Sequence, residues 1–185
     1  MIPQIKVPKF LFKNEGDLQF KDFSKAWGVA IPAFSNGAAC GDLDNDGDLD
    51  LVVNNIDDKA FVFRNTAADG KEKNNYVRLK IDGARPNAEA FGATATIYFD
   101  GKKQTAQLES ARGYISTSEN VLHFGLGKVD KVDSVVVRWN GNFSSTLTNV
   151  PLNQLTVVKY ETARPGPVQP AQAGIFKSLG PAALG

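Results

Sequence analysis

The stretch "YVRLKI", residues 76–81, decides the fold class of this chain. Val77, Leu79 and Ile81 alternate with two basic residues, so apolar and charged side chains fall on opposite faces of an extended segment. This period of two is typical of a β-strand that buries one face and exposes the other. The stretch therefore predicts a sheet with one face packed against a core.

Further segments of the same kind follow at spacings of roughly 8–12 residues, and no window of useful length has a helical period. Turn signals such as Asp100-Gly101 and Asn140-Gly141 separate several of them, because glycine accepts a positive φ. The predicted strands after the first are 93–99, 104–110, 114–118, 121–127, 134–139, 144–150 and 154–160. We predict an all-β fold, with a mostly antiparallel β-sandwich or barrel-like domain over residues 75–161.

Upstream lies an acidic stretch, "GDLDNDGDLDLVV", residues 41–53. Carboxylates occupy alternate positions of a loop that runs directly into aliphatic residues, and Gly47 falls where a sharp turn is needed. Like charges this close repel each other unless a cation gathers them, and calcium takes six to eight oxygen ligands in an irregular shell. The sequence predicts a structural Ca²⁺ site made by Asp42, Asp44, Asp46, Asp48 and Asp50.

The spacing assigns a different part to each carboxylate. Asp42, Asp44 and Asp46 would offer side chains, Asp48 its backbone carbonyl with a solvated side chain, and Asp50 would close the shell. Val53 stands where an EF-hand loop carries its bidentate glutamate, so strands are expected to flank the loop. Magnesium is disfavoured because it keeps its waters; the alternative is a solvated acidic turn.

Composition excludes several other classes. The chain has 21 basic and 20 acidic residues and no basic block, which argues against a nucleic-acid partner, and no apolar window is long enough for a membrane span. One cysteine, Cys40, excludes an internal disulfide and is expected in the core. The single His123 excludes paired-histidine zinc chemistry and is expected to be structural. The first residues lack a signal-peptide core, so the protein stays inside the cell or this chain is part of a longer exported one.

Two segments resemble known families. "FSNGAACGDLDNDGDLDLVVNNIDDKAFVFRN" (34–65) resembles the FG-GAP/VCBS repeat, a calcium-bearing blade of β-propellers, and "FLFKN" (10–14) echoes "FVFRN" (61–65) at a blade-like period. The second segment resembles the ASPIC/UnbV domain of the cartilage acidic protein-like family. It does so through "NNYVRLKIDG", "NAEAFGATATI", "GYISTSENVLHFGLG", "VDSVVVRWNG" and "LTNVPLNQLTVV".

The resemblance implies the end of a propeller followed by a second domain. The expected organisation is a repeat segment over 1–66, a connector over 67–74, the ASPIC/UnbV domain over 75–161 and a Pro/Gly/Ala-rich tail over 162–185. A single blade leaves exposed edges, so we expect the repeat to pack on the ASPIC/UnbV sheet or to pair with another copy.

The resemblance also implies a non-enzymatic, extracellular or cell-surface module of the adhesion type. Its partners would be another protein at the cell surface and the remainder of the propeller. The alternative is glycan binding, with Trp139 and Tyr114 as a stacking platform. A hydrolase is disfavoured because the sequence shows no nucleophile–base order outside the acidic loop.

Overall fold

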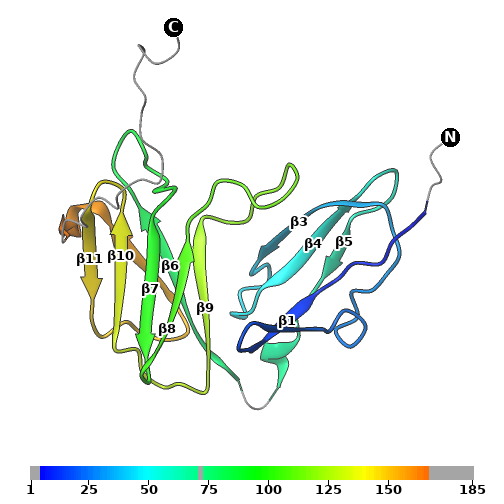
Figure 1. Ribbon diagram of the computed structural model, residues 1–185, viewed down its shortest axis with the longest axis horizontal. Helices are drawn as coiled ribbons and strands as arrows, with labels where there is room; N and C mark the ends of the chain where they lie inside the picture. The colour runs from blue at the N-terminus through cyan, green and yellow to red at the C-terminus, as the bar shows by residue number, and fades with distance from the viewer. Residues whose placement is uncertain (1–4, 71–72, 167–185) are drawn as a thin grey trace, which may run out of the picture.

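The computed structural model describes residues 5–70 and 73–166, and within these ranges the fold is all-β, as predicted. Figure 1 shows two groups of strands that lie side by side and meet at the acidic loop. No helix in the described ranges is long and apolar enough to cross a membrane.

The N-terminal group contains two small antiparallel sheets. A hairpin pairs β1 (Phe12–Gly16) with β2 (Gln19–Asp22). The second sheet has the order β3-β4-β5, formed by Ser35–Gly41, Asp50–Asn55 and Phe61–Phe63. The two echoing motifs overlap β1 and β5, but at only one equivalent position, Phe12 in β1 and Phe63 in β5, so the repeat stays a prediction. The 3-10 helix η1 (Ala67–Asp69) then leads toward the second group.

The second group is a β-sandwich. One sheet has the order β12-β6-β9 and the other β13-β11-β10-β7-β8. The strands are β6 (Asn75–Asp82), β7 (Thr94–Phe99), β8 (Lys102–Gln107), β9 (Val121–Gly127), β10 (Ser134–Trp139), β11 (Phe143–Leu147), β12 (Leu155–Lys159) and β13 (Arg164–Pro165), with the 3-10 helix η2 (Tyr160–Thr162) between the last two. The sheets enclose the principal core, whose buried residues all lie between Val77 and Val158.

Seven of the eight strands predicted in the sandwich are present, β9 and β10 with the predicted ends and five with shifted ends, and the predicted strand 114–118 is wrong. That segment is a closed loop, because Gly113 and Ile115 both have positive φ and the Arg112 amide donates to the Ser116 carbonyl. The Asp100-Gly101 turn is confirmed: both residues have positive φ, as a type I′ hairpin requires.

Two features of the sandwich differ from a simple antiparallel arrangement. β12 pairs in parallel with β6, so the end of the domain returns to its beginning. β13 pairs with β11, so the sheet continues to Pro165, past the predicted domain end at residue 161. The predicted tail continues into residues 167–185, which lie outside the described part of the chain.

The predicted alternation along β6 is observed, and it gives the sheet two different faces. Val77, Leu79 and Ile81 are buried in the core. The intervening side chains point outward, and Arg78 lies opposite His123 of β9 in the antiparallel register. This outer face of the β12-β6-β9 sheet carries no core residues, and it contacts the acidic loop.

Candidate metal centre

The acidic loop connects two paired strands. Gly41 at the end of β3 lies opposite Asp50 at the start of β4, so residues 42–49 close a hairpin, as the sequence predicted. One carboxylate oxygen from each of Asp42, Asp44 and Asp46 lies within 4.8 Å of the others. The three side chains that were expected to surround one ion are therefore brought together.

Asp42 is the most buried of these carboxylates. Its side chain is 1% exposed, and its Oδ2 accepts a hydrogen bond of 2.8 Å from Nη1 of Arg78. Its Oδ1 is buried without a hydrogen-bond partner. A buried carboxylate oxygen without a partner is costly, and a hard cation satisfies it directly.

Asp48 lies on the opposite side of Gly47 from Asp46. Its Oδ2 accepts from the backbone amide of Ala68 at 2.8 Å, and its Oδ1 is also buried without a partner. Burial raises the pKa of the Asp48 carboxyl above its usual range. The expectation of a solvated side chain is wrong here, because η1 folds back and covers this carboxylate.

Asp50 holds the ends of the loop together. Its Oδ2 accepts from the Leu43 amide at 3.0 Å and its Oδ1 from the Asn65 amide at 2.7 Å, and the residue is buried. A carboxylate oxygen has two lone pairs, so these bonds leave acceptor capacity for an ion. Asp50 therefore fixes the loop whether or not it also acts as a ligand.

Arg64, just beyond β5, neutralises the exposed side of the loop. Its guanidinium donates to Asp44 at 2.7 Å, to Asp46 at 3.3 Å and to both oxygens of Asp69 at 2.6 and 2.8 Å. The hydrogen bond from Arg64 lowers the pKa of Asp44 below its usual range. An exposed arginine can move aside for an ion, because such surface pairs contribute little.

The turn at Gly47 is fixed by the sandwich. Nε2 of His123 is 2.9 Å from the Gly47 carbonyl, and because a carbonyl only accepts, Nε2 carries the hydrogen. The Tyr76 ring stacks on His123 with centroids 5.4 Å apart. It also covers Gly47, where a Cβ would fall 2.1 Å from a ring carbon. The expected structural role of His123 is thus observed, with its partner in the acidic loop.

The aromatic residues proposed as a stacking platform do not lie together. Trp139 is buried in the core and donates through Nε1 to Ser145 at 2.9 Å. Tyr114 is exposed on the loop that closes over β3. Cys40 is exposed on β3, contrary to the expectation of a core position, because it borders an open groove that Trp27 and Phe63 also line.

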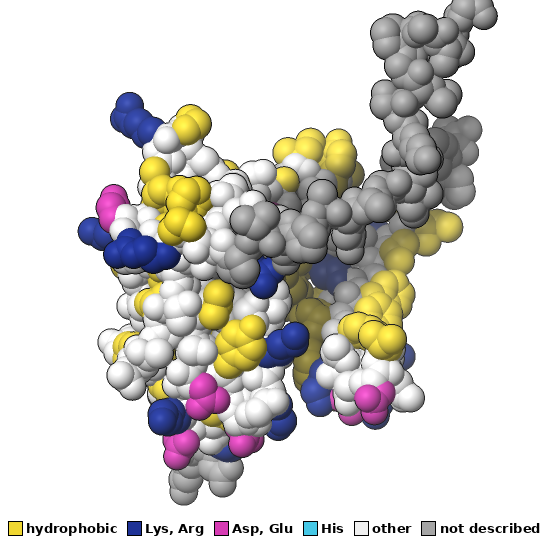
Figure 2. All heavy atoms as spheres, turned by 60° about the vertical axis from the view of Figure 1, so that its left-hand side comes forward, with side chains coloured by type: hydrophobic (Ala, Val, Ile, Leu, Met, Phe, Trp, Pro, Cys, Tyr) yellow, Lys and Arg dark blue, Asp and Glu magenta, His cyan; other side chains and the backbone are white. Residues whose placement is uncertain are grey.

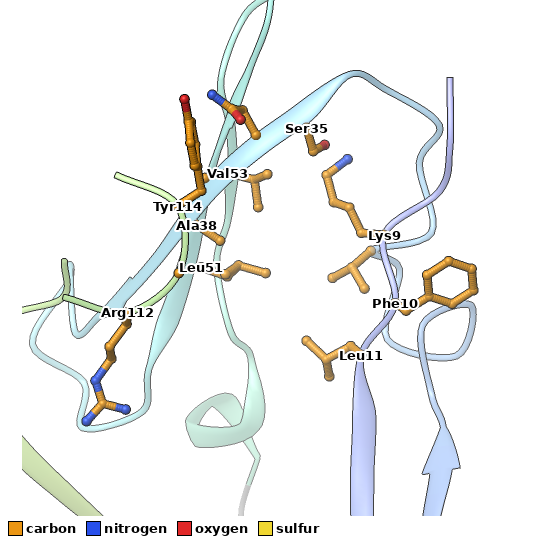
Figure 3. Close-up of a pocket in the computed structure, with 13 residues that line it drawn as sticks. Lys9, Phe10, Leu11, Ser35, Ala38, Leu51, Val53, Arg112 and Tyr114 are labelled. Carbon is orange, nitrogen blue, oxygen red and sulfur yellow. The ribbon is translucent and has the colours of Figure 1, made fainter. Parts of the chain in front are cut away.

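Tyr114 borders a cavity of about 380 Å³ that lies between residues 9–11 and the β3-β4 sheet of the N-terminal group. Figure 3 shows apolar side chains of Ala38, Leu51 and Val53 on one wall and Leu11 on the other, with the Lys9 amine above them. The amine donates to the Ile31 carbonyl at 2.9 Å, and Arg112 points away from the cavity. The cavity thus has apolar walls and a polar rim.

Comparison with known proteins identifies the sandwich. Residues 83–165 match the family model described as ASPIC and UnbV. This part of the chain is an ASPIC/UnbV domain. The chain is 34% identical over 134 residues to cartilage acidic protein 1 of Xenopus tropicalis and 32% identical over 133 residues to that of Homo sapiens. These matches cover 67% and 69% of the chain but 19% of each relative, so the chain spans about a fifth of their length.

The matched segment begins just after the end of β6, so Tyr76 and Arg78 precede it, and His123 lies inside it. Sequence reasoning missed Tyr76, Arg78 and Arg64 as partners of the acidic loop, and it predicted a structural His123 without its partner Gly47. Among the missed residues, Arg78 had one signal in the sequence, its position on the charged face of the predicted strand.

Proposed function

We propose that the acidic loop binds a structural Ca²⁺ ion through Asp42, Asp44, Asp46, Asp48 and Asp50, and that the loop belongs to an FG-GAP/VCBS-type repeat. The observation that carries this proposal is the pair of buried, unpartnered oxygens on Asp42 and Asp48 beside three convergent carboxylates. When bound, the ion would supply positive charge to carboxylates that otherwise repel each other. The residues of the chain hold the loop closed and exclude water from Asp42.

We infer from this arrangement a non-enzymatic interaction module that acts outside the cell. The relatives are named for cartilage, whose matrix is extracellular, and neither their name nor the family description denotes an enzyme. An affinity on the order of 10⁻⁴–10⁻³ M would suffice there. A carboxylate that binds calcium is a poor general acid, which also argues against hydrolysis at the loop.

Protein partners are favoured by the surface of the N-terminal group, which leaves large apolar side chains exposed, among them Phe10, Phe12, Phe20 and Trp27. The face shown in Figure 2 carries both basic and acidic side chains among polar and apolar ones. We propose that the apolar surface seats the remainder of a propeller in a longer protein, and that the outer loops contact an adhesion partner.

Calcium titration by calorimetry tests the site. We expect saturable binding in the range above, lost in Asp42→Asn and Asp46→Asn and retained in Asp58→Asn, an exposed carboxylate that pairs with Lys6 outside the loop. At ten times the dissociation constant, calcium should add about 1.4 kcal/mol to the free energy of unfolding. Absence of binding, or equal binding by all three variants, would contradict the site.

A second candidate function is glycan binding, favoured by the exposed Tyr114 at the rim of the cavity in Figure 3. An exposed aromatic ring beside polar groups can stack on a sugar. Trp139 takes no part, because it is buried. A glycan array with the unaltered chain and with Tyr114→Ala separates the candidates: binding that Tyr114→Ala abolishes supports a lectin, and absence of binding removes it.

A further inference from the structure

The outer face of the β12-β6-β9 sheet meets the acidic loop through three side chains. Tyr76 and Arg78 are alternate residues of β6, and His123 lies opposite Arg78 on β9. All three contact residues 42–47 of the other group of strands. Figure 1 shows this loop, ahead of β4, reaching toward β9.

Arg78 bridges two carboxylates at this contact. Its guanidinium joins Asp42 at 2.8 Å to Glu119, whose oxygens lie at 3.0 and 3.2 Å. The Arg78 and Asp42 side chains are 14% and 1% exposed. Because the pair is desolvated, removing one partner leaves a buried charge, which is costly. Arg78 also engages only Oδ2 of Asp42 and leaves Oδ1 without a protein partner.

Gly47 is held at the same contact from two directions. His123 donates to its carbonyl, and the Tyr76 ring packs against its α-carbon. The φ of Gly47 is +97°, so the turn between Asp46 and Asp48 has a backbone conformation that few other residues adopt. Two aromatic rings of the sandwich thus hold the backbone at the centre of the loop.

We propose that the acidic loop and the outer face of the sandwich are one coupled unit. Arg78, His123 and Tyr76 position the loop for its cation, and the cation in turn strengthens the docking of the two groups of strands. The inference rests on the proposed calcium site and extends it to residues of the second domain. Coupling of this kind is reciprocal, since any contact that favours the bound loop is itself favoured by the ion.

Substitution of Arg78 tests the proposal, because its two possible roles predict opposite changes in calcium affinity. If Arg78 acted only as a nearby positive charge, it would repel a cation, and Arg78→Gln would tighten calcium binding. If Arg78 positions Asp42, the same substitution weakens binding. Lys80→Gln is the matched control: Lys80 is the next outward residue of β6, and its amine pairs with Asp82 at 3.4 Å instead of with the loop.

We expect calorimetry to give an affinity about tenfold weaker in Arg78→Gln and unchanged in Lys80→Gln, within the usual range of coupling between sites. His123→Phe is the second variant, because it keeps an aromatic ring against Tyr76 but removes the hydrogen bond to Gly47. It alters no charge in the neutral imidazole form, and we expect binding about fivefold weaker. Circular dichroism melts establish that each variant is folded.

Docking is measured separately from binding. Spin labels at Lys59→Cys and Lys103→Cys, in a Cys40→Ser background, place one probe on each group of strands, and both lysines are exposed. Pulsed electron–electron double resonance measures the distance between the two labels. Its distribution should be narrow with calcium and broader in chelator. In Arg78→Gln without calcium the distribution should be broader still.

The outcomes separate the two proposals. Calcium binding that is unchanged or tighter in Arg78→Gln and unchanged in His123→Phe would overturn the coupling and leave the calcium site intact. A distance distribution that calcium does not narrow would also overturn it. Absence of calcium binding by the unaltered chain would overturn the calcium site, and the coupling with it.

Discussion

Gly47 is required both by its backbone conformation and by the Tyr76 ring against it. In Gly47→Ala the new Cβ would fall 2.1 Å from a ring carbon at φ +97°. We expect unfolding in urea to show a loss of about 2–5 kcal/mol in the free energy of unfolding, the sum of backbone strain and overpacking. Gly101→Ala is the control, because Gly101 also has positive φ but has no atom within 4 Å of the added Cβ. Its loss should be about 1–2 kcal/mol. Equal losses in the two variants would contradict the packing of Tyr76 on the loop.

The buried Asp48 carboxyl gives a dependence on pH. Burial raises its pKa in the folded chain above the ordinary value, so the folded state holds this proton more tightly than the unfolded state. The resulting cost is absent below pH 3, where the carboxyl is protonated in both states, and is complete above the raised pKa. In chelator, Asp48→Asn should therefore stabilise the chain at pH 7 and leave it unchanged at pH 3. A stabilisation of the same size at both pH values would show that the charge is not its cause.

Consecutive residues of strand β6 face opposite sides of the sheet, one side packed in the core and the other docked against the acidic loop. Leu79 is fully buried between the sheets, whereas Lys80 faces outward. Leu79→Ala should lower the free energy of unfolding by about 2–5 kcal/mol, and Lys80→Ala by less than about 0.5 kcal/mol. Chemical denaturation measures both. A loss in Lys80→Ala that approaches that in Leu79→Ala would mean that the two faces of the strand are assigned incorrectly.

Elements with a regular period could be predicted from the sequence, and contacts between distant elements could not. The alternation in β6 and the Asp100-Gly101 turn depend on neighbouring residues, so local patterns identified them. The loop at 113–116 has the composition of a strand, but positive φ at Gly113 and Ile115 reverses it, which no period reveals. The acidic cluster was found from its spacing. Arg78 was seen only as an outward residue, because its partner Asp42 comes from another sheet.

At the scale of the whole molecule, the buried core lies almost entirely in the sandwich. The described N-terminal residues bury only Val29, Ala33 and Val53 among their apolar side chains, while the principal cluster is confined to residues 77–158. We expect a fragment of residues 74–166 to unfold cooperatively near the transition of the whole chain, and a fragment of residues 5–70 to show no cooperative transition. Calorimetric scans of the two fragments measure this. A cooperative transition in the shorter fragment would show that this half is stable by itself.

The parallel pairing of β12 with β6 has a consequence for how the molecule is made. Leu155 of β12 pairs with Arg78 of β6, so the three-stranded sheet lacks the edge strand β12 until almost the entire domain has been synthesised. Contacts so distant along the chain form slowly, because a long segment must close before they are gained. A ribosome stalled before residue 155 would therefore present a nascent chain that proteases digest, and release of only a short further stretch would make it resistant.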